Sequence, residues 1–392
     1  MIRMIGSVIA VTLVLSLMPT SSTAADPVEI EAILPLTGQA AFIGKASAEG
    51  LKAAENIVNK SGGIGGRPVK FVVADDQSNP QNDVQLANDL IAKHVAVIMG
   101  SALVANCLAM VPLMKNGPVL YCLSPALHPD PGSFVFSGGA AASDTVLVAI
   151  RYARQRGWTR IATINPTDAT GQDADKSIAA ALAEPGNQAL QIVDQQHFNL
   201  TDVSVAAQIA HIQARNPQMV IAWASGTAIG TVFRAINDAS YQVPVLTSQA
   251  NATYAQMAQF AQILPKELYF AGVPSMEPDQ VQDRATKRAV DAYDAALSQL
   301  GVRPEVQATA YDPALIVVDA LRKLGPDATA TQLRDYIAGI RNWVGANGPY
   351  DFRTYPQRGL GVNTATVLRW DAAKGTWYGV SAPGGAPLKG ST

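Results

Sequence analysis

The segment 95–126 limits the fold most strictly, because strand, loop, helix, strand and loop follow one another in it without interruption. Its apolar runs predict a strand, a helix and a second strand, at Val95–Met99, Ala105–Met114 and Val119–Leu123. Parallel strands joined by a crossover helix place both strand-end loops at one edge of the sheet, where open α/β folds bind ligands. We therefore expect the loops Ser101–Asn106 and Ser124–His128 to form one wall of a binding cleft.

The same alternation of strands and helices runs through most of the chain. One series of predicted elements ends near residue 126, and a second begins near Ser143 and reaches a strand over Leu268–Val273. Such alternation is typical of a parallel sheet with helices on both faces. A chain of 392 residues is also too long for one ordinary core. The helices predicted beyond Pro274 lack enough strands for a third sheet, so we expect two α/β domains, one of which these helices join.

The first 25 residues have the pattern of a secretory signal peptide. Arg3 precedes an apolar run over Ile5–Met18, and small residues follow Pro19. We expect cleavage after Ala24 or Ala25 and export of the mature chain. No later run approaches the roughly 18 apolar residues that suggest a membrane span, so a soluble exported protein is expected.

The composition narrows the class of partner. Charged residues make up 15% and apolar residues 48% of the chain, which is typical of a well-buried globular protein. The formal net charge is −2 and the mature part has no Lys/Arg cluster, so nucleic acid is not an expected partner. Neither a metal nor a cofactor is expected, because the histidines lack metal-ligand spacing; they are His94, His128, His197 and His211.

The two cysteines, Cys107 and Cys122, allow two interpretations. They lie on the adjacent helix and strand of the 95–126 segment, so a disulfide is possible in an oxidising compartment. The alternative is a pair of small buried hydrophobic side chains. The sequence leaves both open.

Short motifs occur in a fixed order over about 350 residues. They are Leu34-Pro-Leu-Thr-Gly38 with Gly44, Asn59-Lys-Ser-Gly-Gly-Ile-Gly-Gly66, Asp75-Asp76, Gly100 with Ala109 and Pro112, Ser124-Pro125, Tyr311-Asp312, Gly348-Pro-Tyr-Asp-Phe352 and Arg369-Trp-Asp. By this order and spacing the mature chain resembles the type I periplasmic solute-binding proteins of ABC transporters, in the leucine/isoleucine/valine-binding group. The resemblance carries expectations for the fold, the function and the site.

The implied fold has two lobes, each a mainly parallel sheet flanked by helices, joined by three hinge crossovers. Lobe one would comprise residues 26–141 and 274–345, and lobe two 142–273 and 346–392. The lobes would close around a small ligand. The implied protein is a periplasmic monomer without catalytic activity that delivers its ligand to ABC transporter permease subunits.

The resemblance places the ligand's carboxylate against first-lobe loops, where hydroxyls and backbone N–H groups at helix N-termini bind anions. Ile43 falls where relatives often have an aromatic ring, and Phe42 beside it could substitute. The family's loop serine falls on Val104, so another polar side chain of these loops would have to donate the hydrogen bond. The implied first-lobe ligand residues are Phe42, Ile43, Ser101, Val104, Asn106, Ser124, Ala126, Leu127 and His128.

The second lobe departs from the family pattern at the position that binds an amino group. The acidic residue that accepts the ammonium of an amino-acid ligand falls near Ser248-Gln249, where no carboxylate stands. A buried ammonium without a carboxylate partner is costly, which argues against an α-amino acid. Thr170 falls where a tyrosine is usual. The implied second-lobe ligand residues are Thr170, Trp223, Ser225, Gly226 and Gln249.

Apolar or aromatic walls, donors for a carboxylate and no ammonium acceptor together predict an aromatic or branched carboxylic acid as ligand, of the benzoate, benzoylformate or lignin-derived type. The walls would come from Phe42, Val104, Tyr121 and Trp223. Simpler interpretations stay open for two of these wall residues, Trp223 and Tyr121, as core side chains, and for His128 as a surface loop residue.

Three other functions remain alternatives. A branched-chain or other amino-acid-binding protein of the same family is the first. A secreted α/β hydrolase is the second, since this architecture hosts many enzymes; however, Gly-x-Ser-x-Gly is absent and Ser225-Gly226 lacks the flanking glycine. A soluble sensory protein for the same ligand is the third.

Overall fold

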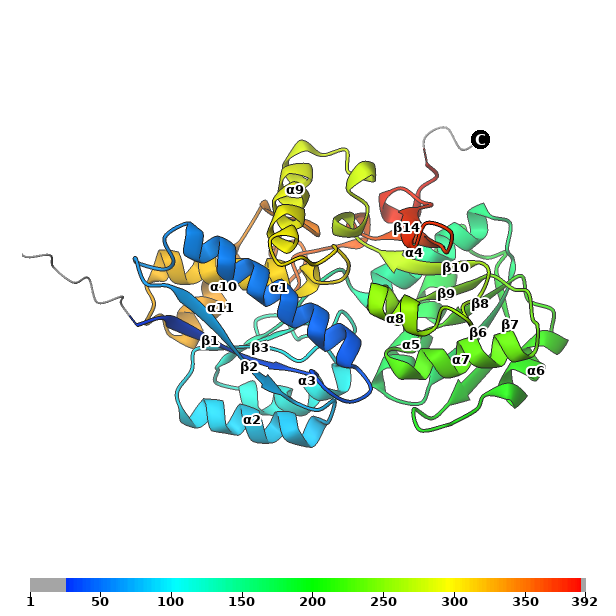
Figure 1. Ribbon diagram of the computed structural model, residues 1–392, viewed down its shortest axis with the longest axis horizontal. Coiled ribbons are helices and arrows are strands. Elements are labelled where there is room, and N and C mark those ends of the chain that lie inside the picture. Colours follow the sequence, from blue (N-terminus) through cyan, green and yellow to red (C-terminus); the bar gives the residue numbers. More distant parts are fainter. Residues whose placement is uncertain (1–25, 389–392) are drawn as a thin grey trace, which may run out of the picture.

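A computed structural model describes residues 26–388 of the chain, so the predicted signal peptide lies outside the described residues. The described chain forms two α/β lobes, each built on its own sheet (Figure 1). A two-stranded ribbon completes the sheets.

The first lobe contains a parallel sheet in the order β2-β1-β3-β4-β5. Its strands are β1 (Val28–Leu34), β2 (Val69–Asp75), β3 (Val97–Gly100), β4 (Val119–Cys122) and β5 (Val135–Ser137). Every residue of β3 and β4 is buried, as expected of central strands covered on both faces. The loops Ser101–Asn106 and Ser124–His128 leave these two central strands.

Helices cover both faces of this sheet. They are α1 (Ala41–Lys60), α2 (Pro80–Ala92), α3 (Val104–Met110), α9 (Arg284–Ser298), α10 (Ala308–Leu324) and α11 (Ala330–Gly339). Side chains of α1, α9, α10 and α11 share one core with Ala32 of β1, whereas those of α2 and α3 pack with the next residue, Ile33. Successive strand residues point to opposite faces, so the late helices α9–α11 return to the first lobe on the side of α1 (Figure 1).

The second lobe contains a sheet in the order β14-β13-β10-β9-β8-β6-β7. Its strands are β6 (Arg160–Pro166), β7 (Gln191–Phe198), β8 (Met219–Ala222), β9 (Val245–Thr247), β10 (Leu268–Gly272), β13 (Thr366–Asp371) and β14 (Thr376–Gly379). Five strands are parallel, and β13 and β14 add an antiparallel edge. The helices are α4 (Ala142–Gln155), α5 (Ala169–Ala183), α6 (Ala206–Ala214), α7 (Thr227–Asp238) and α8 (Tyr254–Gln259). Helices α4 and α5 cover one face, and α6, α7 and α8 the other.

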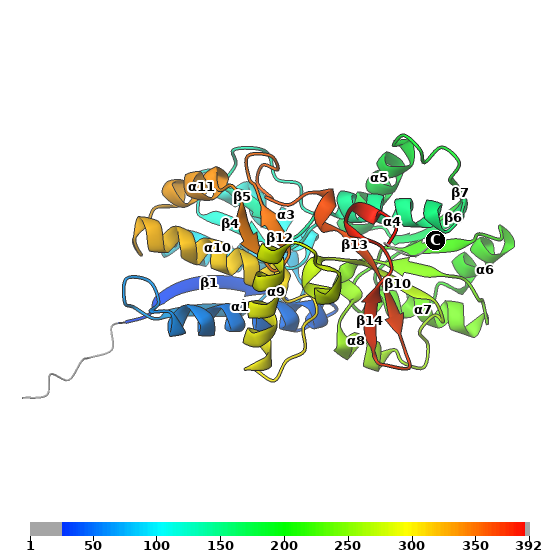
Figure 2. The same ribbon diagram turned by 90° about the horizontal axis from the view of Figure 1, so that it is seen from above.

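The described chain passes between the lobes three times, after β5, after β10 and after the ribbon β11 (Trp343–Gly345) and β12 (Gly348–Tyr350) (Figure 2). Tyr350, Phe352 and Leu360 still belong to the first-lobe core, beyond the expected boundary at 345. After the ribbon β11–β12, the chain rejoins the second sheet at β13. The division of the chain into lobes at residues 141, 273 and 345 stays a prediction. The core contacts indicate that the first lobe extends to Leu360 on the third crossover.

The predicted alternation of strands and helices is confirmed, although helix α8, the ribbon β11–β12 and two further local features differ from the prediction. The helix expected over Ala105–Met114 is α-helical only to Met110 and continues as a 3₁₀ turn over Val111–Met114. Pro112 explains the change, because its ring cannot continue an α-helix interior. The short strand β5 was not predicted, since three residues carry too little periodicity.

Cys107 of α3 and Cys122 of β4 form a disulfide, with a Cα–Cα distance of 6.0 Å. Both side chains are fully buried. The first of the two interpretations left open by the sequence is therefore the one found. The bond fixes α3 to the strand that precedes the Ser124–His128 loop.

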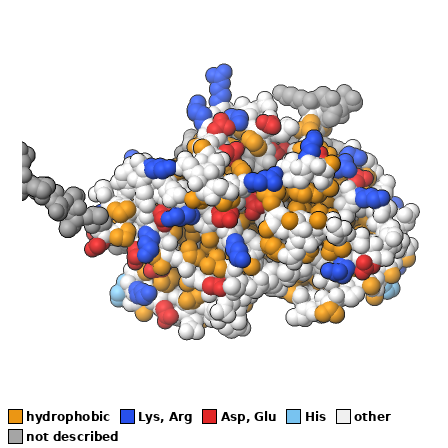
Figure 3. Space-filling view, in the orientation of Figure 1, with side chains coloured by type: hydrophobic (Ala, Val, Ile, Leu, Met, Phe, Trp, Pro, Cys, Tyr) orange, Lys and Arg blue, Asp and Glu red, His pale blue; other side chains and the backbone are white. Residues whose placement is uncertain are grey.

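The visible face of the molecule carries mixed charge. Lys and Arg side chains are interspersed with Asp and Glu over both lobes, and hydrophobic side chains lie among them (Figure 3). This face therefore presents no extended field of a single sign.

Candidate ligand-binding cleft

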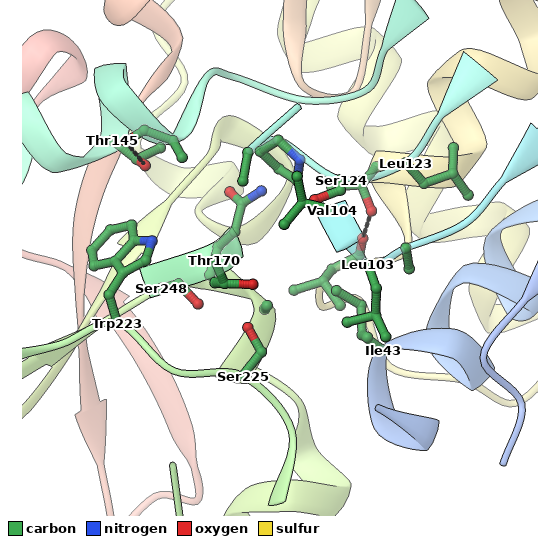
Figure 4. Close-up of a pocket in the computed structure, with 18 residues that line it drawn as sticks. Ile43, Leu103, Val104, Leu123, Ser124, Thr145, Thr170, Trp223, Ser225 and Ser248 are labelled. Carbon is green, nitrogen blue, oxygen red and sulfur yellow. Dashed lines mark hydrogen bonds between the residues drawn. The ribbon is translucent and has the colours of Figure 1, made fainter. Parts of the chain in front are cut away.

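A cleft lies between the two lobes, at the strand ends from which the ligand loops leave. The empty space between its walls amounts to about 590 Å³ when the open solvent at its mouth is included. Figure 4 shows Trp223, Ser225 and Ser248 on one side and Ile43, Val104 and Ser124 facing them from the other. The lining residues are Ile43, Ala102, Leu103, Val104, Leu123, Ser124, Pro125, Ala126, Ala142, Thr145, Thr170, Trp223, Ser225, Ser248, Gln249, Ala250, Val306 and Thr309.

The first-lobe wall is formed mainly by the two loops expected from the 95–126 segment. Val104 begins α3, and Ser124 and Ala126 follow β4. Ile43 comes from the first turn of α1. The parallel pairing of β3 and β4 places these two loops side by side at one edge of the sheet, as the 95–126 segment predicted.

The side chains of Ser101 and Asn106 do not reach the cleft. Ser101 Oγ donates to the buried carboxylate of Asp76 at 2.6 Å, and Asn106 Nδ2 donates to the buried carboxylate of Asp83. Both carboxylates need these donors, because a buried acid without hydrogen bonds is costly. Of the three candidate side chains for the ligand hydrogen bond, only Ser124 lines the cleft.

The buried acid Asp83 makes the stability of the first lobe depend on pH. Burial, followed by the nearby charge of Asp76, raises the pKa of Asp83 to about 8. A raised folded-state pKa contributes stability that is present below the unfolded pKa of about 4 and is lost as the pH rises towards 8. Asp83→Asn should therefore raise the free energy of unfolding at about pH 8 by about 1–3 kcal/mol, with a smaller gain at about pH 5.

Urea unfolding at the two pH values measures this difference. Asp89→Asn is the matched control, because Asp89 lies exposed on the same helix, α2. An equal change at both pH values in Asp83→Asn would contradict the assignment.

The second-lobe wall combines hydroxyls, an amide and one large ring. Thr170 lies in the first turn of α5, Trp223 and Ser225 follow β8, and Gln249 follows β9. Trp223 is only 3% exposed and also belongs to the core beneath the sheet, so it is both core and cleft wall. Asp168, the acid nearest to Thr170 in the sequence, caps α5: its carboxylate accepts a hydrogen bond from the N–H of Gly171 at 3.1 Å.

Besides Ser101 and Asn106, four further residues expected at the site stand outside the lining. Phe42 is partly exposed on α1, and Leu127 is buried with its N–H donated to the Ser124 carbonyl at 3.3 Å. His128 is half-exposed and pairs with Asp173 at 2.7 Å. Gly226 is the N-cap residue that precedes α7, and it lies against the Gln39 backbone of the first lobe. Tyr121 is fully buried in the first-lobe core, which confirms its simpler interpretation.

The lobes are in contact around the cleft. Ala40, Ile43 and Ala102 of the first lobe pack into the core cluster of the second. The N–H of Thr227 donates to the Gln39 carbonyl at 3.1 Å. These contacts describe a closed arrangement of the two lobes.

The cleft is neutral. Among the described residues that line it, none carries a charged side chain. Two polar oxygens of the wall, Ser248 Oγ and Gln249 Oε1, are buried without a hydrogen-bond partner in the structure. Buried polar atoms are almost always satisfied, so these two are available to a ligand.

A family model for periplasmic binding proteins matches residues 27–376. The chain belongs to the periplasmic binding protein family. Its place in the type I Leu/Ile/Val-binding group rests on relatives and solved structures as well.

Leu/Ile/Val-binding protein homolog 3 of Brucella melitensis is 23% identical over 233 residues, which are 58% of this chain and 62% of that protein. BraC3 of Rhizobium johnstonii, also a Leu/Ile/Val-binding protein, is 31% identical over 119 residues, 30% of this chain and 32% of the relative. The chain thus spans less than two thirds of the curated relatives it matches.

Solved structures share the fold over almost their whole length. An extracellular ligand-binding receptor from Rhodopseudomonas palustris HaA2 superposes with a TM-score of 0.79 at 18% identity, over 90% of this chain and 99% of that one. LivJ from Streptococcus pneumoniae, solved in complex with isoleucine, gives 0.75 at 17% identity, over 91% and 99%. At these identities the likeness shows the two-lobed type I periplasmic binding protein fold.

Several cleft residues of this binding protein carried no signal in the sequence. Ala142 and Thr145 line the cleft from α4, which follows the first crossover, and Val306 and Thr309 line it from the start of α10 and the residues just before it. Their positions depend on how the lobes meet, which no local pattern records. Within residues 26–388, the helices are too short or too polar to cross a bilayer, and His, Cys, Asp and Glu side chains form no group suited to a metal ion.

Proposed function

We propose that this chain is the solute-binding component of an ABC importer and that its cleft binds a small aromatic carboxylic acid. The observation that carries the proposal is the chemistry of the lining: apolar side chains, hydroxyls from both lobes and, among the described lining residues, no acidic group. Such a pocket suits a ligand with an apolar body and few polar groups.

The carboxylate end would lie against the first-lobe wall. Ser124 supplies a hydroxyl there, and Leu103 and Val104 line the cleft at the beginning of α3. The first N–H groups of a helix have no partner within the helix and favour an anion. A carboxylate therefore finds donors on this side without a cationic side chain.

The body of the ligand would lie between Trp223 on the second lobe and Ile43 and Val104 on the first (Figure 4). The unpartnered oxygens of Ser248 and Gln249 lie on the second-lobe wall. A hydroxyl substituent could donate to the Gln249 amide oxygen and a carbonyl could accept from the Ser248 hydroxyl. Ring-substituted acids of the hydroxybenzoate type fit this pattern of groups.

A branched-chain amino acid is the second candidate, because the relatives are named for leucine, isoleucine and valine. In this cleft an ammonium would meet only neutral oxygens, such as those of Ser225, Ser248 and Gln249. The desolvation cost of a buried cation is only partly offset when no carboxylate pairs with it, which weakens binding. The lining therefore favours the acid over the amino acid.

A melting-temperature screen separates the two candidates. Benzoate, 4-hydroxybenzoate and benzoylformate should stabilise the protein by about 2.7 kcal/mol at about 100 times Kd, and leucine, isoleucine and valine should not. Stabilisation by the amino acids alone would establish the second candidate. An unchanged melting temperature with every compound would overturn binding of both classes.

The transport role follows from the family. The mature chain would be exported to the periplasm, bind its ligand as a monomer and present the closed form to permease subunits. In the described part of the chain none of the cleft serines is hydrogen-bonded to a histidine, as a serine hydrolase would need. Recovery of the stabilising acid unchanged after long incubation tests the absence of turnover.

A further inference from the structure

One ion pair joins the two lobes at the edge of the cleft. Nε2 of His128 lies 2.7 Å from Oδ1 of Asp173. His128 ends the first-lobe loop that begins at Ser124, and Asp173 lies on α5 of the second lobe. The His128 side chain is 50% exposed and that of Asp173 is 12% exposed.

The pair is directly linked to the cleft walls. Ala126 lines the cleft two residues before His128, and Thr170 lines it three residues before Asp173, one helical turn away. A contact between His128 and Asp173 therefore sets the separation of a first-lobe loop from a second-lobe helix at the mouth of the cleft.

Asp173 depends on His128 for its hydrogen bonding. Its second oxygen, Oδ2, is buried and has no partner in the structure. When the imidazole is protonated the contact is a charge-assisted hydrogen bond, whereas a neutral imidazole offers a dipole only. The mostly buried carboxylate is then left poorly compensated.

Other charged groups surround the pair. Arg358, on the third crossover, donates to the carbonyls of Leu127 and Gly139 and acts on the charges of both Asp173 and Asp144. Asp144 of α4 is also within the electrostatic reach of His128 and of Arg151. On the outer side, Lys115, Asp130 and Arg334 line the surface hollow that His128 borders. The permanent cation Arg358 stands with His128 on the first-lobe side, and two acids face them from the second.

We propose that His128 and Asp173 form a proton-dependent latch that favours the closed arrangement of the lobes at low pH. His128 is a positioning residue in this scheme, acting on the cleft through the loop that carries Ala126. The proposal rests on hinge closure, which is part of the proposed function, but not on the chemical class of the ligand.

A histidine is suited to this role because imidazole is the side chain that changes its charge within the physiological pH range. A carboxylate attracts a protonated imidazole more strongly than a neutral one, so protonation favours the closed arrangement, in which the two groups meet. An ion pair with one partner half-exposed, as His128 is, changes an equilibrium by about two- to fivefold.

The test measures closure without ligand. Spin labels on Ala92→Cys of α2 and Ala210→Cys of α6, both exposed and one on each lobe, report the distance between the lobes. The ratio of closed to open molecules should be about two- to fivefold higher at about pH 5.5 than at about pH 8. His128→Gln and Asp173→Asn should each abolish this response to pH.

The chain offers a matched control in His197. Its Nε2 also lies 2.7 Å from an aspartate, Asp175, with 41% and 25% of the side chains exposed, but both residues belong to the second lobe. His197→Gln should leave the pH response of the lobe distance intact.

Two results would overturn the latch. One is a closed-to-open ratio in the labelled wild type that does not change with pH. The other is a pH response that survives in His128→Gln, or that His197→Gln removes as well. A failed acid screen with an intact pH response would instead count against the ligand class alone.

Discussion

Gly226→Ala is expected to hold the two lobes apart. A Cβ at Gly226 would lie 2.1 Å from the carbonyl oxygen of Gln39, a backbone atom of the opposite lobe. Real Cβ atoms do not approach an oxygen this closely, so the lobes must separate or the backbone must move. A cost of about 1.4 kcal/mol already lowers the closed-to-open ratio tenfold, and we expect at least that.

The backbone of Gly226 adds a second, separable effect. Its φ of +65° and ψ of −136° lie in a region that residues with a Cβ rarely adopt. Alanine should therefore also lower the free energy of unfolding by about 1–3 kcal/mol, whether the lobes are open or closed. Urea unfolding measures this loss, and the spin-label distance measures closure.

Gly157→Ala controls for backbone strain alone. Gly157 has a φ of +70° in the same lobe, and a Cβ there would meet no atom within 4 Å. It should cost stability without changing the lobe distance. A wild-type lobe distance in Gly226→Ala would show that the crossovers absorb the clash.

Gly226 illustrates what the sequence could and could not predict about the cleft. The resemblance pointed to the loop Trp223–Gly226, and two of its residues, Trp223 and Ser225, line the cleft. Which residues of the loop face the ligand depends on the opposite lobe: Ser225 lines the cleft, whereas Gly226 contacts the Gln39 backbone. Contacts between lobes leave no periodicity in either segment.

The first-lobe wall shows the same limit at the level of side chains. The ends of predicted strands indicate where loops lie, and the loops after β3 and β4 lie side by side at the cleft, as the sequence predicted. Whether Ser101 or Asn106 points into the cleft is decided by the buried acids Asp76 and Asp83, which lie far away in sequence. The absence of an acid near Ser248-Gln249, by contrast, could be read directly, because it needs only the residue types at an aligned position.

Removing the disulfide Cys107–Cys122 is expected to cost the largest share of stability. The bond closes a loop with a sequence separation of 15 residues, and cross-links of this size stabilise a fold by about 3 kcal/mol, mainly by restricting the unfolded chain. It also joins α3 to β4 directly behind Val104 and Ser124. Cys107→Ala with Cys122→Ala should therefore lower the free energy of unfolding by about 3 kcal/mol in urea.

The wild-type chain, refolded under reducing conditions, separates the cross-link from the packing of the sulfur atoms. It keeps both sulfur atoms in the same buried region, where they need only move apart to a non-bonded distance, so most of any loss relative to the oxidised protein belongs to the bond. We expect most of the roughly 3 kcal/mol to be lost in this form too. If reduced and oxidised wild type instead unfold at the same urea concentration, the unfolded chain is not restricted by the bond, and the stability of the first-lobe wall comes from the core around α3 alone.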